Sequence, residues 1–498
     1  MLRKIRIALA VLMLTGITLL FLDFTGGVHA YLGWMAKIQF LPAFLALNFG
    51  VVAALILLTL LFGRVYCSVI CPLGIMQDFF GWLGRRGKSH RNRYSWSPAK
   101  KVLRYTMLGI FLIALVAGIG SLSSLLAPYS AYGRIVQGLL APVYAWGNNL
   151  LAYFAERADS YAFYRTDVWL KGVSTLVVAI LTLVVLAVLA WRNGRTYCNT
   201  ICPVGTVLSF FSRFAMFRPV IDAEKCRDCK LCEHRCKASC IHIDEHKIDY
   251  SRCVDCFDCI DNCKFGALKF RYAWGKIPGQ AGNDAKNAGN DASRRAFLVG
   301  SAMVAGSAVL DAQHKKVDGG LAVIEQKEAP VRETPIVPPG ARSLRHFYQH
   351  CTACQLCVST CPNGVLRPSR DLRTLMQPEA SYERGFCRPE CTRCSEVCPS
   401  GAIERITVEE KTAIQVGHAV WIKDNCLSAQ GVHCRSCVRH CPAGAIQMVP
   451  MDPEDKTSPK IPVVNEAKCI GCGACENLCP ARPFSAIHVE GYTIHNEI

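Results

Sequence analysis

The cysteines of this chain are spaced in a way that decides most of what it can fold into. Of its 29 cysteines, 24 lie in six runs of four. Thiolates are soft ligands, and the spacing C-x2-C-x2-C-x3-C lets three cysteines wrap one iron–sulfur cluster while the fourth reaches a neighbouring cluster. A run of this kind must fold against a partner run, so the sequence predicts six 4Fe–4S clusters in paired-cluster domains.

The first two runs follow the standard spacing without exception. Both lack the usual proline after the fourth cysteine, where Lys237 and Lys264 stand instead. We expect each cluster to take three cysteines from one run and one from the other. The predicted ligand sets are Cys226, Cys229, Cys232 with Cys263, and Cys253, Cys256, Cys259 with Cys236.

Four more runs occupy the C-terminal region, and each is followed by proline, at Pro362, Pro399, Pro442 and Pro480. Two of them have a wider first gap, which changes the loop over a cluster without removing a ligand. The sequence leaves the pairing among these runs open. The runs are Cys351, Cys354, Cys357, Cys361; Cys387, Cys391, Cys394, Cys398; Cys426, Cys434, Cys437, Cys441; and Cys469, Cys472, Cys475, Cys479.

Four apolar stretches are each long enough to cross a bilayer, which takes about 20 residues. The chain is 51% hydrophobic and carries a net charge of +18. Its residues 85–104 hold eight Lys and Arg and no acid; this composition is typical of a cytoplasmic loop, and it favours a membrane over nucleic acid as partner. The predicted spans are 5–22, 39–62, 103–127 and 172–191, with the N-terminus inside and the first span as an anchor rather than a cleaved signal peptide.

Two matched segments carry the next four cysteines. Residues 63–74 and 194–205 agree at eight of twelve positions, and each contains a C-x3-C-P loop after an apolar stretch. We therefore predict that each repeat consists of two helices followed by a cysteine loop. The loop cysteines are Cys67, Cys71, Cys198 and Cys202, at the cytoplasmic membrane surface. They are an additional redox or metal site, a pair of reversible disulfides, or residues that only shape the helix ends.

The predicted outer loop, 128–171, contains a moderately apolar piece at 138–154, which we expect to be a surface or re-entrant helix. Counting it as a span would put the two cysteine loops on opposite faces. Asp23 and His29, in the first outer loop, could handle protons, but a solvated loop is the expectation for both. No residue set identifies a catalytic or quinone site.

A twin-arginine pair, Arg294 and Arg295, precedes a weakly apolar run and resembles a twin-arginine export signal. An ordinary basic pair before a short buried helix is the alternative. The predicted organisation is a membrane domain at 1–205, a cytoplasmic two-cluster domain at 206–270, a flexible linker at 271–292, a twin-arginine-type signal or anchor helix at 293–310, a tether at 311–345 and a periplasmic four-cluster domain at 346–498.

Other cysteine chemistries fit less well. Zinc ribbons use two separated C-x2-C knuckles rather than four cysteines in one short run. Disulfides form in an oxidising compartment, but twin-arginine export carries domains that are already folded and loaded. No C-x-x-C-H occurs, which excludes covalent c-type haem. Cys240 stands where Ala267 stands in the next run, so we expect a structural thiol.

These motifs together resemble the NapGH quinol dehydrogenase family. The first 270 residues are similar to the membrane ferredoxin-type protein NapH (MauN), and residues 293–498 to its periplasmic partner NapG (MauM). The departure is that both are fused in one chain. The predicted fold is a membrane α-helical bundle of four spans plus a fifth twin-arginine-type span, with two α+β ferredoxin-like polycluster domains.

The resemblance implies an oxidoreductase of the bacterial inner membrane. It would take electrons from the membrane quinone pool, with quinol as substrate, and pass them through six 4Fe–4S clusters to a periplasmic cytochrome or terminal reductase. Two other functions stay open: a conduit from a cytoplasmic donor, and an accessory factor that supplies electrons for maturation or reactivation of a metalloenzyme.

Overall fold

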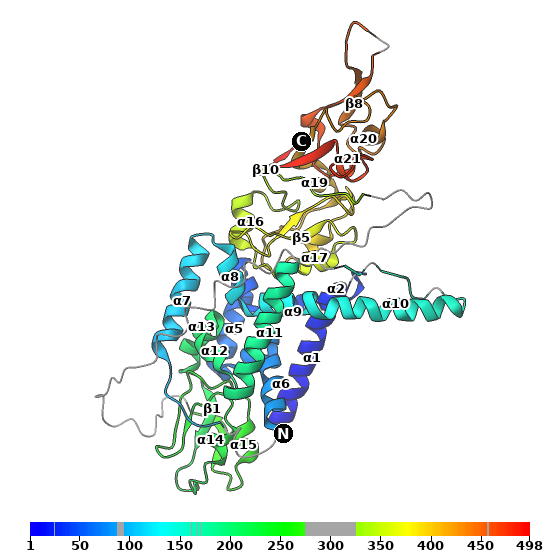
Figure 1. The fold of residues 1–498 in the computed structure, drawn as a ribbon. Helices are drawn as coiled ribbons and strands as arrows, with labels where there is room; N and C mark the ends of the chain where they lie inside the picture. The colour runs from blue at the N-terminus through cyan, green and yellow to red at the C-terminus, as the bar shows by residue number, and fades with distance from the viewer. Residues whose placement is uncertain are drawn as a thin grey trace, which may run out of the picture.

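The molecule is elongated, with a helical bundle between two cysteine-rich domains that lie at its opposite ends (Figure 1). The structure, a computed structural model, describes residues 1–23, 25–86, 94–160, 162–166, 168–169, 171–273, 325–455 and 458–498. The predicted twin-arginine helix at 293–310 lies outside the described residues. So do nearly all of the predicted linker and the first part of the predicted tether.

Two helices in the described part of the chain are long and apolar enough to cross a membrane. They are α1 (Leu2–Leu22) and α11 (Val173–Asn193), and both run along the long axis of the bundle in Figure 1. They coincide with the first and fourth predicted spans. Helix α11 ends at Gly194, whose φ of 64° is a conformation that glycine adopts without steric cost.

The other two predicted spans are not continuous helices. Residues 39–62 form α4 (Phe40–Leu45) and α5 (Phe49–Phe62), because the Asn48 side chain accepts from the Val51 amide and starts a new helix. Residues 103–127 form α7 (Lys101–Val116) and α8 (Gly120–Leu126), separated at Gly118, which has a φ of 71°. The prediction of four uninterrupted spans is therefore not supported.

The end of the bundle next to the four-cluster domain contains several further helices, most of them short. Helices α2 (Gly27–Leu32) and α3 (Trp34–Lys37) pack against α1, and they are followed further along the chain by α9 (Pro128–Ile135), the π-helix η3 (Val136–Leu140) and α10 (Ala141–Arg157). Helix α10 lies across the direction of α1 and α11 (Figure 1). It exposes Trp146, Leu151 and Phe154. The expected surface or re-entrant helix at 138–154 is thus a helix lying across the bundle.

The two cysteine loops have the same local structure. In the first, a π-helix η1 (Tyr66–Ile70) leads into α6 (Pro72–Arg86); in the second, α12 (Thr196–Thr200) leads into α13 (Pro203–Ser212). The proline of each C-x3-C-P motif is the first residue of the second helix, where the missing amide hydrogen costs nothing. The motif is therefore a helix-to-helix corner with both cysteines at its bend.

The two-cluster domain lies beside the N-terminus (Figure 1). Strand β1 (Phe217–Ile221) pairs antiparallel with β4 (Leu268–Tyr272), and β2 (Ile241–His242) with β3 (Lys247–Ile248). Two one-turn helices, α14 (Leu231–Arg235) and α15 (Asp258–Asn262), contact each other and each carries the third cysteine of its run. The buried core around them is small and consists largely of cysteines.

The four-cluster domain lies at the other end and consists of two halves. The half next to the bundle contains α16 (Leu344–His350), α17 (Leu356–Thr360), β5 (Leu366–Pro368), β6 (Pro378–Ala380), α18 (Arg393–Val397) and α19 (Val408–Ala413). The far half contains β7 (Ile414–Trp421), α20 (Ser436–Arg439), β8 (Ile446–Pro450), β9 (Lys460–Val464), η4 (Glu466–Lys468), α21 (Ala474–Asn477) and β10 (Ile487–Glu497). The sheets are antiparallel pairs, β5 with β6, β7 with β10, and β8 with β9.

The described part of the predicted tether is folded against this domain. Lys327 Nζ donates to the carbonyl oxygens of Glu476, Asn477 and Cys479 at 2.6, 2.8 and 2.9 Å. Further along, Ile336 and Val337 are buried. The segment from Lys327 onward is therefore part of the four-cluster domain, and the expectation of a tether to residue 345 is corrected.

An ion-pair network fastens the two-cluster domain to the bundle. Lys237 Nζ lies 3.4 Å from Asp78 Oδ2 on α6 and 2.9 Å from Asp258 Oδ2 on α15. Asp78 also pairs with Arg6 and Arg195, and Asp258 with Arg3. Lys237 is the residue that replaces the usual proline after the fourth cysteine, so this departure from the motif has a structural purpose.

We predict that Lys237→Met loosens this junction. Lys237 is the side chain that links Asp78 to Asp258, which keep their arginine partners, and the loss of a hydrogen bond to a charged group costs about 2 kcal/mol. The thermal unfolding midpoint of the detergent-solubilised protein should fall, and a protease should cleave near residue 215 sooner. Lys264→Met is the matched control, because Lys264 holds the same place in the next run but is exposed. Equal behaviour of the two variants would contradict the assigned role.

Candidate iron–sulfur sites

The structure brings the eight cysteines of the two-cluster domain together as two sets of four. Cys226, Cys229, Cys232 and Cys263 line one cavity, and Cys253, Cys256, Cys259 and Cys236 line a second. Each set takes three cysteines from one run and the last from the other. This is the arrangement that the spacing predicted, and it places four thiols around each space that a cubane would fill.

The structure also pairs the four C-terminal runs, which the sequence left open. The first run exchanges its last cysteine with the second, and the third with the fourth. The four sets are Cys351, Cys354, Cys357 with Cys398; Cys387, Cys391, Cys394 with Cys361; Cys426, Cys434, Cys437 with Cys479; and Cys469, Cys472, Cys475 with Cys441.

Backbone conformation explains how a standard run wraps its site. In the four runs with the standard spacing, both neighbours of the second cysteine have positive φ. Non-glycine residues seldom adopt this conformation, and successive amides in such a turn point into one concave space that binds anions. The pairs are Asp228 and Lys230, Asp255 and Phe257, Ala353 and Gln355, and Gly471 and Gly473.

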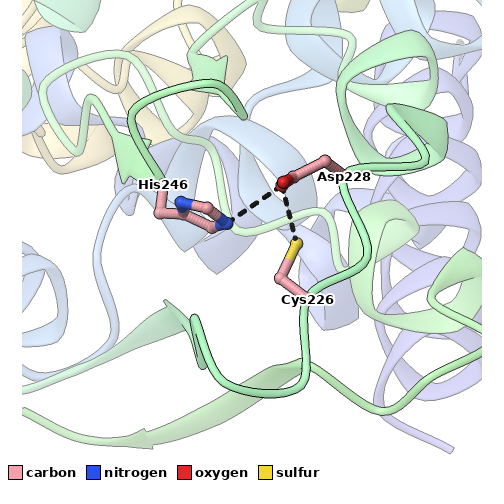
Figure 2. Close-up of side chains that lie close together, drawn as sticks. All are labelled: Cys226, Asp228 and His246. Atoms are coloured by element: carbon pink, nitrogen blue, oxygen red, sulfur yellow. Dashed lines mark hydrogen bonds and ion pairs between the residues drawn. The ribbon is translucent and has the colours of Figure 1, made fainter.

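Ligand spacing argues against zinc. Four sulfurs bound to one zinc ion at about 2.3 Å lie about 3.8 Å apart. In the part of the chain that the structure describes, the one group with three ligand atoms within 4.8 Å of one another is Cys226, Asp228 and His246 (Figure 2). The four-cysteine sets are therefore wider than a single ion requires, and this width suits a cluster with iron and sulfide between the cysteines.

Cys226, Asp228 and His246 lie close together in Figure 2, but we do not assign them to a separate metal site. Asp228 Oδ1 lies 3.0 Å from His246 Nε2 and 3.5 Å from Cys226 Sγ. Cys226 already belongs to a four-cysteine set, and Asp228 is exposed. The Asp228–His246 pair is best described as the solvent-facing rim of that set.

The thiols are suited to iron rather than to disulfide chemistry. All 29 cysteines are free in the structure. Burial raises the pKa of Cys232 and of Cys472 to about 12, and that of Cys437 to about 11. These thiols stay protonated at neutral pH until a metal displaces the proton, so loading releases protons and is favoured at higher pH.

Cys240 is a fifth cysteine beside the second set. It is buried, lines the same cavity, and its Sγ lies 3.5 Å from Cys236 Sγ. Ala267 lines the cavity of the first set in the equivalent position. The four ligand positions of the set are filled without Cys240, so a structural thiol remains the prediction.

Cys67, Cys71, Cys198 and Cys202 lie together in the interior of the bundle, in the same buried core as Cys354 and Cys357 of the four-cluster domain. We expected them at the membrane surface, because each follows an apolar stretch. They are buried within the protein, since α1, α6 and the helices of both repeats enclose them, and their depth relative to a membrane stays a prediction.

The first outer loop also differs from its expectation. Asp23 is buried rather than solvated, and its carboxylate accepts from the amides of Thr25, Gly26 and His29 and from the Thr25 hydroxyl. Asp23 therefore holds the turn that starts α2. No catalytic side chain is identified by this geometry.

Lys411 is a residue that the sequence did not identify. It is buried, and its Nζ donates to Cys387 Sγ at 3.2 Å, to the Arg388 carbonyl at 2.6 Å and to the Cys391 carbonyl. Nothing in its local sequence, a short capped helix, distinguishes it from a surface lysine. A cation that donates to a ligand sulfur stabilises the more negative, reduced cluster.

Comparison with known proteins supports iron–sulfur binding in the bundle and in the four-cluster domain. A 4Fe–4S binding domain model matches residues 44–90 and 175–220, and two 4Fe–4S dicluster domain models match residues 350–403 and 432–482. The methylamine utilization ferredoxin-type protein MauM of Paracoccus denitrificans is 33% identical over 174 residues, which is 32% of this chain and 73% of that protein. The chain belongs to the ferredoxin-type proteins with 4Fe–4S domains.

Two further relatives define the extent of this family likeness. The ferredoxin-type protein NapG of Escherichia coli is 32% identical over 32% of this chain and 75% of its own length. The ferredoxin-type protein NapF of the same organism is 28% identical over 32% of this chain and 87% of its own length. Membership of the ferredoxin-type family thus rests on about a third of the chain.

We predict that Lys411→Gln lowers the reduction potential of one cluster and leaves the others unchanged. The charge that favours the reduced state is lost, so reduction becomes harder. The measurement is a redox titration followed by electron paramagnetic resonance. Lys423→Gln is the control, because Lys423 is an exposed lysine of the same domain.

The same signal tests the crossed ligand pairing. It should disappear in Cys361→Ala and persist in Cys398→Ala, since Cys361 belongs to the set that Lys411 contacts and Cys398 to the neighbouring one. The reverse outcome would show that each run fills its own site.

Proposed function

We propose that this iron–sulfur electron-transfer protein spans the bacterial inner membrane, oxidises membrane quinol and delivers the electrons to a periplasmic acceptor, a cytochrome or terminal reductase. A 4Fe–4S cluster accepts and releases one electron at a time. The observation that carries the proposal is the placement of ligand sets at both ends of one apolar bundle (Figure 1).

In each cluster domain, one ligand set is in contact with the bundle. On the N-terminal side, Asp255, between the ligands Cys253 and Cys256, accepts from the Arg64 amide at 3.1 Å. On the other side, a Cβ atom at Gly133 of α9 would lie 2.4 Å from the Cys354 carbonyl oxygen. Helix α17, which carries Cys357, contacts α1. The ligand sets nearest the bundle are therefore in direct contact with it.

Within the four-cluster domain, the ligand sets of the two halves are also in contact with each other. The Cys387 amide donates to the Cys472 carbonyl at 2.9 Å, and Cys472 lines the cavity of the set that contains Cys387. This contact joins the half next to the bundle to the far half. It supports a series of sets that leads away from the bundle, as delivery to a soluble acceptor requires.

Several features support a membrane position and the proposed orientation. Helix α11 exposes Val177, Ile180, Val184, Val185 and Val188, which suits contact with lipid. Its C-terminal end contacts α6, whose last turn leads into the basic stretch 85–104. This favours a cytoplasmic two-cluster domain. The twin-arginine pair at Arg294 and Arg295 favours export of the domain on its C-terminal side.

Quinol as the donor is supported by the family resemblance and by this geometry. A lipid-soluble donor meets the bundle before it meets either cluster domain, and the ligand sets around Cys256 and Cys354 are the ones that contact the bundle. A second candidate is a conduit from a cytoplasmic reductant. Cys229 favours it, because this ligand is exposed at the outer rim of the two-cluster domain.

The experiment compares two donors on membranes that contain the full chain. We expect a reduced quinol analogue to bleach the cluster absorbance under anaerobic conditions, and a quinone-site inhibitor to prevent it. A reduced soluble ferredoxin added to the cytoplasmic face serves as the second donor. Clusters that stay oxidised with quinol but are reduced by ferredoxin would replace the quinol proposal with the conduit.

The orientation has its own test. A reporter enzyme that is active only in the periplasm, fused after Ile498, should be active in the wild type and silent when Arg294 and Arg295 are changed to lysine. The same reporter inserted after Tyr272 should be silent in both. Activity after Tyr272, or silence after Ile498 in the wild type, would contradict the proposed orientation.

A further inference from the structure

Each of the two cysteine loops in the helical bundle has fewer cysteines than an iron–sulfur cluster needs. Its two matches to a 4Fe–4S binding model, at 44–90 and 175–220, contain two cysteines each. A cubane cluster takes four thiolates. Neither repeat can therefore complete a site alone, and the question is whether the structure joins the two pairs.

The two repeats are interlocked at their cysteine loops. Arg64 of the first repeat donates through Nη2 to the Cys198 carbonyl at 3.2 Å, and Arg195 of the second donates through Nη1 to the Cys67 carbonyl at 2.6 Å. Arg64 and Arg195 occupy the same position of the motif. The contacts are thus reciprocal, as in a pair of related units packed about a twofold axis.

Glycines of the same motif leave the space for this exchange. A Cβ atom at Gly74 would lie 2.2 Å from the Cys67 carbonyl oxygen and 2.9 Å from Arg195 Nη1. A Cβ atom at Gly205 would lie 2.3 Å from the Cys198 carbonyl oxygen and 2.8 Å from Arg64 Nη2. The two motifs therefore agree at these positions because each must let the other repeat's arginine pass.

The charge balance of the site requires anions. Arg64 and Arg195 are both fully buried. Arg195 pairs with Asp78, but no carboxylate among the described residues forms an ion pair with Arg64. A buried guanidinium is unfavourable without a counter-charge close to it. Asp255 accepts from the Arg64 backbone amide rather than from its guanidinium, and metal-bound thiolates would supply negative charge at the guanidinium itself, where Nη2 contacts Cys67 Sγ.

Hydrogen-bond donors point at the sulfurs themselves. Arg64 Nη2 lies 3.7 Å from Cys67 Sγ, Gln77 Nε2 lies 3.2 Å from Cys198 Sγ, and the Gly205 amide lies 3.4 Å from Cys202 Sγ. Both repeats contribute donors, and Gln77 reaches across from the first repeat to the second. Donors of this kind stabilise ligand thiolates around a metal site.

We propose that Cys67, Cys71, Cys198 and Cys202 together hold one iron–sulfur cluster that is shared by the two repeats, with Arg64 and Arg195 as its counter-charges. Among the described residues, no three of these sulfurs lie within 4.8 Å of one another. That spacing is wider than four thiolates on a single zinc ion adopt. The centre is a seventh, in addition to the six that the four-cysteine runs supply.

The position of this centre suits it to carry electrons between the two cluster domains. It lies in the same large buried core as Cys354 and Cys357, and Arg64 donates to the two-cluster domain, from its amide to Asp255 and from Nη1 to the Ser251 carbonyl. It would take one electron from one side and give that electron to the other, with no bond made or broken. This use rests on the proposed function, but the presence of the centre does not.

The experiment measures iron and acid-labile sulfide per full-length chain, purified anaerobically in detergent. Cys67→Ser and Cys198→Ser should each lose the iron of one cluster, and the double variant should lose no more than either single variant. The non-additive loss identifies one site shared by both repeats. Cys240→Ser is the matched control, a buried cysteine outside the four, and it should keep all its iron.

Each other outcome overturns the proposal. Full iron in both single variants would show that no cluster is there, and a double loss in the double variant would show two separate sites. Zinc in place of the missing iron, or a disulfide between these cysteines in the denatured, alkylated protein, would identify the alternative chemistry. Unchanged electron paramagnetic resonance of the six other clusters shows that the variants have folded. None of these measurements uses quinol, so their results do not depend on whether the proposed function is correct.

Discussion

The exchange of one cysteine between neighbouring runs is the constraint on which the rest of this structure depends. No run completes a ligand set alone, so two runs must be in place before either cluster is fully bound. The protein parts that surround the clusters are too small to enforce this by themselves. Their helices are one or two turns long, and their sheets have two strands each. The clusters therefore act as the core of these domains. The polypeptide holds the far half in place through the segment that begins at Lys327 and through the β7–β10 pair.

The helical bundle also joins two repeats by a reciprocal exchange, which here involves arginines. Arg64 and Arg195 each donate to a cysteine carbonyl of the other repeat, and this exchange holds the two cysteine loops together. Lys237 extends the scheme to the two-cluster domain by joining Asp78 on α6 to Asp258 on α15. Cations thus accumulate where the anionic clusters are expected. Charge compensation and domain attachment are performed by the same side chains.

The sequence predicts the features that depend on local spacing and misses those that depend on contacts between segments. The ligand sets of the two-cluster domain can be derived from spacing, because only two runs are present. Four equivalent runs allow several pairings, and the choice depends on how the halves pack. An averaged hydropathy also treats 39–62 and 103–127 as continuous, because one capping residue, Asn48, and one glycine, Gly118, hardly change the average. Lys411 carries no local signal, since its importance lies in the distant Cys387.

Exposure along the series of sites limits where electrons can enter and leave. The four loop cysteines inside the bundle are all buried. The ligand sets of the cluster domains mix buried and partly exposed cysteines, and Cys229 is the one exposed ligand among the described residues. A soluble partner can approach only the rims, because electron transfer needs close contact with a ligand set. A lipid-soluble donor is restricted to the sets that touch the bundle. A chain that merely exchanged electrons between two soluble proteins would not need buried cysteines in an apolar bundle, so the burial of the four loop cysteines is what favours a membrane donor.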